Sequence, residues 1–117
     1  MTHDINIHHE DDHESASSYL VEEIRNLLVN SNRNFSIGLS GGNTPKLTYS
    51  MIAEKFDDLS KTFLWTIDDR WIEEDNDLSN QRMINEYFER TNANILKFEF
   101  TSSSPESDAK KYEDKLK

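Results

Sequence analysis

Two short polar stretches of this 117-residue chain carry groups that could bind or transform a ligand. The first is Ser40-Gly41-Gly42-Asn43-Thr44. Glycine lets the backbone turn sharply and approach a ligand closely, and the two hydroxyls could add contacts. Free N–H groups at the start of a following helix would favour an anion as the ligand. The simpler interpretation is a tight turn followed by a helix cap.

The second stretch is Asp68-Asp69-Arg70. An arginine can hold a phosphate through two parallel hydrogen bonds, and a carboxylate can bind sugar hydroxyls or move a proton. Taken alone, the same three residues would form a surface ion pair and a helix cap. Two such stretches on neighbouring loops favour a shared binding site over coincidence.

Alternating strand and helix patterns position both stretches. Apolar residues alternate over 35–39 and predict a strand that ends at the first stretch. Thr44 suits a helix N-cap, and Pro45 suits the first helical position. The compact apolar run Thr62 to Ile67 predicts a strand buried on both faces, which leads into the second stretch. Ser79 is a predicted cap of the helix that follows.

The remaining segments continue the alternation. Ile5 and Ile7 predict a short N-terminal strand, and a helix is expected over 11–30 with Asp11 and Glu14 as a capping box. Alternating apolar residues over 96–100 predict a fourth strand, and Ser104-Pro105 opens a last helix up to Lys117. This order is typical of an α/β fold, a parallel sheet flanked by helices. Ligands bind beyond the carboxyl ends of such strands, so both stretches should open on one side.

Composition excludes several function classes. The formal net charge of −10 argues against nucleic acid and against an anionic membrane surface as partners. The absence of cysteine excludes disulfides, thiolate metal sites and a cysteine nucleophile. The sequence shows no signal peptide and no membrane-spanning run, so we expect a cytoplasmic protein. The hydrophobic content of 34% is low and indicates a modest core.

Three ordered motifs carry a family resemblance. They are Leu39-Ser40-Gly41-Gly42-Asn43-Thr44-Pro45, Asp68-Asp69-Arg70-Trp71 and Leu78-Ser79-Asn80-Gln81-Arg82-Met83. In this order and at these separations they resemble the S-G-G-x-T-P, D-E-R and S-N motifs of the 6-phosphogluconolactonases, which are related to glucosamine-6-phosphate deaminases. The resemblance covers nearly the whole chain.

The resemblance implies a Rossmann-like fold and hydrolysis of 6-phosphogluconolactone to 6-phosphogluconate in the pentose phosphate pathway, without a metal or organic cofactor. By position, residues 40–44 would line the sugar-phosphate pocket. Arg70 would bind the phosphate and Asp68 would be a substrate-binding or proton-handling carboxylate. Asn80 would shape the loop. The partner is then a small sugar phosphate.

Two departures from the family pattern stand out. Asp69 replaces the usual glutamate, which shortens that carboxylate by one methylene. The G-x-G-x-D-G-H stretch, whose histidine is taken to activate water, is absent from this sequence. We therefore expect residues 1–117 to be the N-terminal portion of a single domain of this type, poorly stable and inactive alone, and a second chain could supply the missing half.

The histidines of this chain are His3, His8, His9 and His13. They cluster near the N-terminus without metal-site spacing, so a solvated surface is the expected setting.

Other interpretations stay open at this point. A deaminase or isomerase of amino-sugar phosphates would share the glycine stretch, although Arg70 favours the lactonase. A sugar-phosphate binder without catalysis and a purely structural module are further candidates. Among single residues, we assign Trp65 to the core and Trp71 to either a core or a ligand contact. Lys46 could steer a phosphate or lie on the helix surface, and the second is the simpler assignment.

Overall fold

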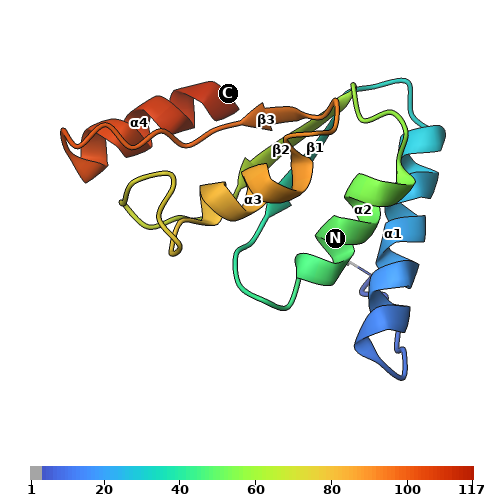
Figure 1. Ribbon diagram of the computed structural model, residues 1–117. Coiled ribbons are helices and arrows are strands. Elements are labelled where there is room, and N and C mark those ends of the chain that lie inside the picture. Colours follow the sequence, from blue (N-terminus) through green and yellow to red (C-terminus); the bar gives the residue numbers. More distant parts are fainter. Residues whose placement is uncertain (1–3) are drawn as a thin grey trace.

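The computed structural model describes residues 4–117, and over this range helices and strands alternate along the chain (Figure 1). The elements are α1 (His13–Val29), β1 (Phe35–Leu39), α2 (Lys46–Lys55), β2 (Thr62–Thr66), α3 (Asn80–Phe88), β3 (Asn94–Leu96) and α4 (Pro105–Leu116). The predicted α/β class with a parallel sheet is confirmed. Ser79 caps α3 by accepting a hydrogen bond from the Arg82 amide, and Ser104 caps α4, both as predicted.

The three strands form one parallel sheet in the order β1-β2-β3. Phe35 lies opposite Thr62, and Phe63 lies opposite Asn94. Because all three strands run the same way, the loops after β1 and β2 leave the sheet at the same edge. The two polar stretches of the sequence lie on these loops.

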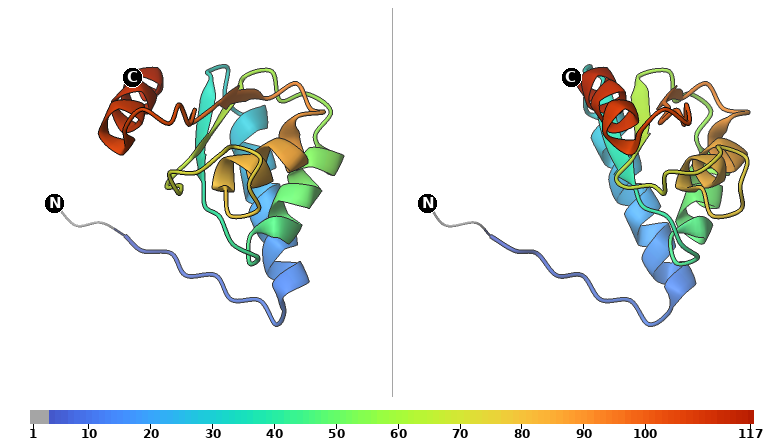
Figure 2. Two further views of the ribbon diagram at one scale, coloured as in Figure 1. Left: turned by 60° about the vertical axis from the view of Figure 1, so that its left-hand side comes forward. Right: turned by 90° about the vertical axis from the view of Figure 1, so that its left-hand side faces the viewer.

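Helices α1, α2 and α3 pack together on one face of the sheet, and α4 lies apart from them on the other side (Figure 2). The core between the three helices and the sheet consists of Val21, Leu39, Tyr49, Ile52, Leu59, Leu64, Ile84 and Phe88. Burial along β2 alternates: Thr62, Leu64 and Thr66 are buried. Phe63 and Trp65 point the other way and are only half-buried. The prediction of a strand buried on both faces is therefore wrong, because no helix within residues 4–117 covers the second face closely.

Trp65 belongs to this second face rather than to the core predicted for it. Its indole Nε1 donates a hydrogen bond to Ser36 Oγ at 2.8 Å. Its ring fills the space left by Gly38, where an added Cβ would lie 2.8 Å from the nearest ring atom. The tryptophan thus packs flat along the strands on a face that solvent reaches.

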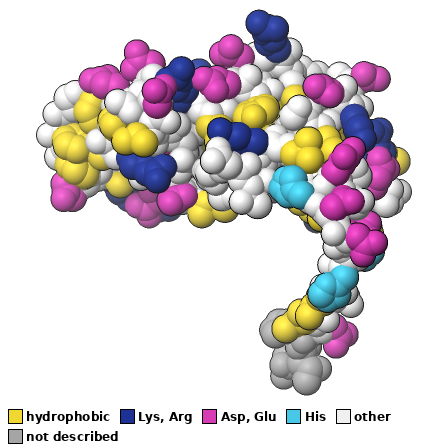
Figure 3. Space-filling view, turned by 60° about the horizontal axis from the view of Figure 1, so that its bottom comes forward, with side chains coloured by type: hydrophobic (Ala, Val, Ile, Leu, Met, Phe, Trp, Pro, Cys, Tyr) yellow, Lys and Arg dark blue, Asp and Glu magenta, His cyan; other side chains and the backbone are white. Residues whose placement is uncertain are grey.

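The N-terminal segment departs from the prediction of a strand. Residues 4–10 have no regular structure, and the side chains of Ile5 and Ile7 are 84% and 75% exposed. The segment extends away from the body of the molecule (Figure 3). Its alternation has no neighbouring strand to pair with, and a strand needs such a partner. The predicted capping box is also wrong, because α1 is capped by Asp12, which accepts a hydrogen bond from the Ser15 amide at 2.7 Å.

The fourth predicted strand is short and stops early. β3 ends at Leu96, and the Phe98 amide donates to the Gln81 side chain at 2.9 Å instead of continuing a ladder. The Phe98 ring packs edge-on against Tyr112 of α4. The Tyr112 hydroxyl in turn donates to the carbonyl of Thr66 and accepts from its amide.

None of the helices in residues 4–117 combines the length and the apolarity that a membrane crossing requires.

Candidate functional site

The two polar loops meet at Gly41 and Asn80. A Cβ built on Gly41 would lie 2.0 Å from Asn80 Oδ1, far inside contact distance, so only glycine permits this approach. Gly42 has φ of +91°, a conformation that glycine adopts without strain. The first glycine is thus required by a neighbour across the site, and the second by the turn itself.

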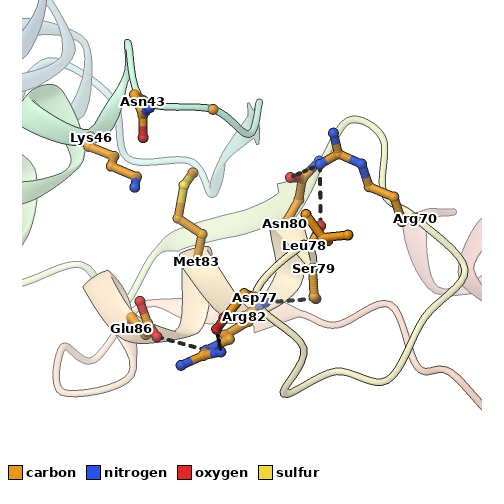
Figure 4. Close-up of a pocket in the computed structure, with 11 residues that line it drawn as sticks. Asn43, Lys46, Arg70, Asp77, Leu78, Ser79, Asn80, Arg82, Met83 and Glu86 are labelled. Atoms are coloured by element: carbon orange, nitrogen blue, oxygen red, sulfur yellow. Dashed lines mark hydrogen bonds and ion pairs between the residues drawn. The ribbon is translucent and has the colours of Figure 1, made fainter.

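A hollow of about 350 Å³ opens where these loops meet. Its lining includes Gly42, Asn43, Lys46, Arg70, Asn80 and Met83. Figure 4 shows Lys46 and Arg70 on opposite sides of the hollow, with Met83 between them. The sequence-based expectation that both loops open onto one cavity is met by this arrangement. Of the two roles considered for Lys46, a place on the helix surface and attraction of a phosphate, its position in the lining favours the second.

Arg70 is exposed, and among the residues that the structure describes its guanidinium is held only by uncharged oxygens. Its Nη1 donates to the Leu78 carbonyl at 3.2 Å and to Asn80 Oδ1 at 3.1 Å. Neither partner neutralises the guanidinium charge. The remaining N–H groups of the fork stay available for an anion in the hollow.

A third cation on this side, Arg82, differs in having its charge compensated. It forms ion pairs with Asp77 and Glu86, and the hydrogen bond from its Nε to Glu86 is 2.9 Å long. This hydrogen bond to Glu86 is the main cause that raises the pKa of Arg82. In Figure 4 the Arg82 side chain lies with its two acidic partners, away from Asn43. The uncompensated charges at the hollow are therefore those of Lys46 and Arg70.

Asp69 anchors the second loop to the start of α3. Its Oδ1 accepts hydrogen bonds from the amides of Arg70 and Asn80, each at 2.8 Å, and its Oδ2 accepts from the Gln81 amide at 3.0 Å. A carboxylate at a helix N-terminus satisfies amides that have no partner inside the helix. The length of aspartate suits these contacts. The helix-cap interpretation therefore holds for Asp69, whereas sequence reasoning gave no sign of its partners.

The helix after the glycine loop has no such cap. α2 begins at Lys46 with Pro45 as its N-cap, which makes no side-chain capping hydrogen bond. The prediction of Thr44 as the N-cap is wrong by one residue, because Pro45, whose carbonyl accepts from Tyr49, occupies that position. The first amide of α2, that of Lys46, donates to the Asn43 carbonyl at 3.3 Å, so the backbone turn supplies the partner that a capping side chain would otherwise give.

Besides Gly41, which lies against Asn80, three predicted site residues are absent from the lining of the hollow. Ser40 and Thr44 face a separate, mostly apolar groove of about 660 Å³ between α1 and the free edge of β1. The Ser40 carbonyl there accepts the Tyr49 hydroxyl at 2.8 Å. The Asp68 side chain is exposed on the side toward α4, and its carbonyl accepts Asn80 Nδ2 at 2.9 Å. The structure thus joins Gly42, Asn43, Arg70 and Asn80 in one hollow and leaves these three at its margins.

His8, His9 and His13 are absent from the lining of the hollow. His8 stacks on Tyr19 with ring centroids 3.5 Å apart, and His13 begins α1. His3 falls outside the described residues. Within residues 4–117, no group of three or more His, Cys, Asp or Glu side chains is arranged to hold a metal ion.

Comparison with known proteins gives this geometry a context. The family model described as glucosamine-6-phosphate isomerases/6-phosphogluconolactonase matches residues 9–117. A 6-phosphogluconolactonase of Synechocystis sp. is 35% identical over 85 residues, which are 69% of this chain and 35% of the relative.

Solved structures agree with this match. A 6-phosphogluconolactonase from Shewanella baltica superposes with a TM-score of 0.81 at 26% identity, over 92% of this chain and 48% of that one. The enzyme from Thermotoga maritima gives a TM-score of 0.74 at 30% identity, over 86% of this chain and 49% of that one. The chain thus spans about half the length of these solved relatives. It belongs to the glucosamine-6-phosphate isomerase/6-phosphogluconolactonase family.

Proposed function

We propose that this chain provides the phosphate-binding part of a 6-phosphogluconolactonase. The observation that carries the proposal is the hollow in which Gly42 and Asn43 of the first loop, with Lys46 at the start of α2, face Arg70 of the second loop and Asn80 at the start of α3. Family membership supplies the substrate class, because the related enzymes from Synechocystis, Shewanella and Thermotoga are named 6-phosphogluconolactonases.

The phosphate would lie between Lys46 and Arg70. Both cations lack a carboxylate partner in the described part of the chain, and the Arg70 guanidinium is held only by the Leu78 carbonyl and Asn80 Oδ1. An anion at this position would satisfy donors that the protein leaves open. The sugar would then extend from the hollow toward the loop that carries Asp68, for which a substrate-binding or proton-handling role remains our proposal. Ser40, Gly41 and Thr44 would shape the same margin.

Calorimetric titration with 6-phosphogluconate tests this proposal. We expect saturable binding that weakens about tenfold or more in Arg70→Ala, since hydrogen bonds to a charged group contribute about 1.5–3 kcal/mol. Arg33→Ala removes the same charge from the loop before β1, at the opposite end of the strands, and should leave the affinity unchanged. If both variants lose the same affinity, the effect is one of net charge, and the proposed phosphate site is contradicted.

Hydrolysis adds water across the lactone C–O bond and needs a base to take the proton of the attacking water. His8, His9 and His13 lie outside the hollow, and the histidine-bearing stretch of the resembled family is absent from this sequence. We propose that residues outside this 117-residue sequence supply the base and that these 117 residues alone are inactive. The free edge of β1 and the apolar groove beside it provide a surface on which such residues would pack.

A complementation assay tests whether a separate portion of the enzyme supplies the missing base. The probe is the portion of the Synechocystis 6-phosphogluconolactonase outside the region that this chain matches. We expect neither chain alone to exceed the spontaneous hydrolysis rate of 6-phosphogluconolactone, and the mixture to exceed it. Turnover by this chain alone, or no turnover by a mixture that forms a complex, would overturn the proposed division of labour.

The choice of sugar phosphate can be tested in the same calorimeter. Glucosamine 6-phosphate should bind more weakly than 6-phosphogluconate if the lactonase assignment is correct. Stronger binding of the amino sugar would favour the isomerase branch of the family instead, and binding of neither would leave a structural module. A cytoplasmic location and the absence of nucleic-acid partners stay predictions from composition.

A further inference from the structure

Asp108 is a charged side chain that the proposed chemistry does not use and that is nevertheless buried. It lies in the first turn of α4 with 1% of its surface exposed. Its Oδ2 accepts hydrogen bonds from Trp71 Nε1 at 3.0 Å and from the Thr101 amide at 2.8 Å, and its Oδ1 accepts from Thr101 Oγ1 at 2.5 Å. Hydrogen bonds from Thr101, and then the one from Trp71, hold the pKa of Asp108 at about 2.

Burying a carboxylate is unfavourable unless its oxygens accept hydrogen bonds, so the burial of Asp108 depends on its three donors. Two of its three hydrogen bonds only fold the short segment before α4 onto the helix. The third reaches 37 residues back along the chain, to the loop that carries Arg70. The Trp71 ring also packs edge-on against Phe100, with centroids 5.1 Å apart. This long-range contact fixes Trp71 although 41% of its surface is exposed.

Arg70 consequently stands between two anchors. On one side, Asp69 binds the first amides of α3. On the other side, Trp71 binds Asp108 of α4. The backbone of Arg70 is tied at both neighbouring residues, while its guanidinium keeps free donors. Preorganising a binding group in this way lowers the entropy that is lost when the ligand binds.

We infer that Asp108 is a positioning residue that acts through Trp71 to hold Arg70 in place for a phosphate. The inference rests on the proposed function of Arg70. It assigns a role in ligand binding to α4, a helix that contributes no residue to the lining of the hollow.

Two matched variants separate positioning from mere stability. Trp71→Phe removes the indole N–H and keeps an aromatic ring against Phe100. Thr101→Val removes the other side-chain donor to Asp108 and leaves Trp71 bonded. We expect Trp71→Phe to weaken 6-phosphogluconate binding about three- to tenfold, and Thr101→Val to lower the urea midpoint without changing the affinity. Asp108→Asn should resemble Trp71→Phe in affinity.

A ligand-independent readout keeps this inference separate from the proposed function. Nitrogen-15 relaxation of Arg70 Nε should show greater mobility in Trp71→Phe than in wild type or in Thr101→Val. If wild type binds no sugar phosphate, the proposed function fails, and the relaxation data alone decide the positioning. Unchanged Arg70 mobility and affinity in Trp71→Phe, or equal effects of the two variants, would overturn the inference.

Discussion

The two loops that form the hollow achieve their shapes by opposite means. The loop after β1 is defined by side chains that it lacks: Gly41 makes room for Asn80, and Gly42 takes a positive φ. The loop after β2 is defined by side chains that it has, with Asp69 bonded to α3 and Trp71 bonded to α4. The comparison teaches that the first loop depends on local backbone freedom and the second on distant anchors.

The largest effect should come from filling the space at Gly41. In Gly41→Ala the new Cβ must displace the Asn80 side chain, which also bonds to Arg70 and to the Asp68 carbonyl. Overpacking and lost hydrogen bonds should lower the free energy of unfolding by about 2–4 kcal/mol and weaken phosphate binding. Urea denaturation and calorimetry measure the two effects.

Gly42→Ala is the matched control for that substitution. An added Cβ at this position meets nothing within 4 Å, so only the backbone conformation resists it. We expect a loss of about 1 kcal/mol. If the two alanine variants lose equal stability, the close approach of Asn80 to Gly41 is not the reason for the glycine.

An intermediate effect should follow from releasing the anchor of the second loop. Asp69→Ala removes the acceptor for the amides of Asn80 and Gln81, and loss of such a helix-capping side chain costs about 1–2 kcal/mol. Hydrogen exchange at these two amides should accelerate in the variant. Asp69→Glu tests whether the length of this side chain matters. Faster exchange of the two amides would show that the shorter carboxylate fits this chain. Equal exchange would show that the difference from the family pattern has no structural consequence.

The smallest effect on stability should appear only at acid pH. It is best measured by comparing two carboxylates, Asp108 near the site and Asp58 far from it. Hydrogen bonds from Ser60, and then Asn92, hold the pKa of Asp58 at about 2, as those from Thr101 and Trp71 do for Asp108. An unfolded aspartate titrates near pH 3.9, so the stabilisation by each carboxylate is present above about pH 4 and is lost as the pH falls toward 2.

Urea denaturation across this pH window measures the loss. Asp58→Asn should flatten the acid dependence and leave sugar-phosphate binding at neutral pH unchanged, whereas Asp108→Asn should alter both. An acid profile that Asp58→Asn leaves as steep as in wild type would contradict the assignment of this window to Asp58.

The sequence predicted the loops that depend on local chemistry better than those that depend on distant contacts. The position of the glycine loop followed from residue types alone, since few other residues permit such a turn. The roles of Asp69 and Trp71 could not be predicted, because their partners lie 11 and 37 residues away. A single sequence carries no record of such pairs.

The two strand predictions that failed, at Ile5 and Ile7 and over 96–100, also depended on distant hydrogen-bond partners. Ile5 and Ile7 alternate as a strand would, yet a strand forms only where another edge accepts its hydrogen bonds. Phe98 and Phe100 also alternate, but the Gln81 side chain takes the Phe98 amide out of the ladder.

The phenol of Tyr112 has a consequence for how the sheet ends. The Ile67 amide donates to Leu39 on β1, so the amide and carbonyl of the preceding residue, Thr66, face the β3 side. The Tyr112 hydroxyl engages both groups, as a continuing strand would. A single oxygen from α4 thereby substitutes for the next stretch of main chain, and the residues after Leu96 are released to run toward that helix.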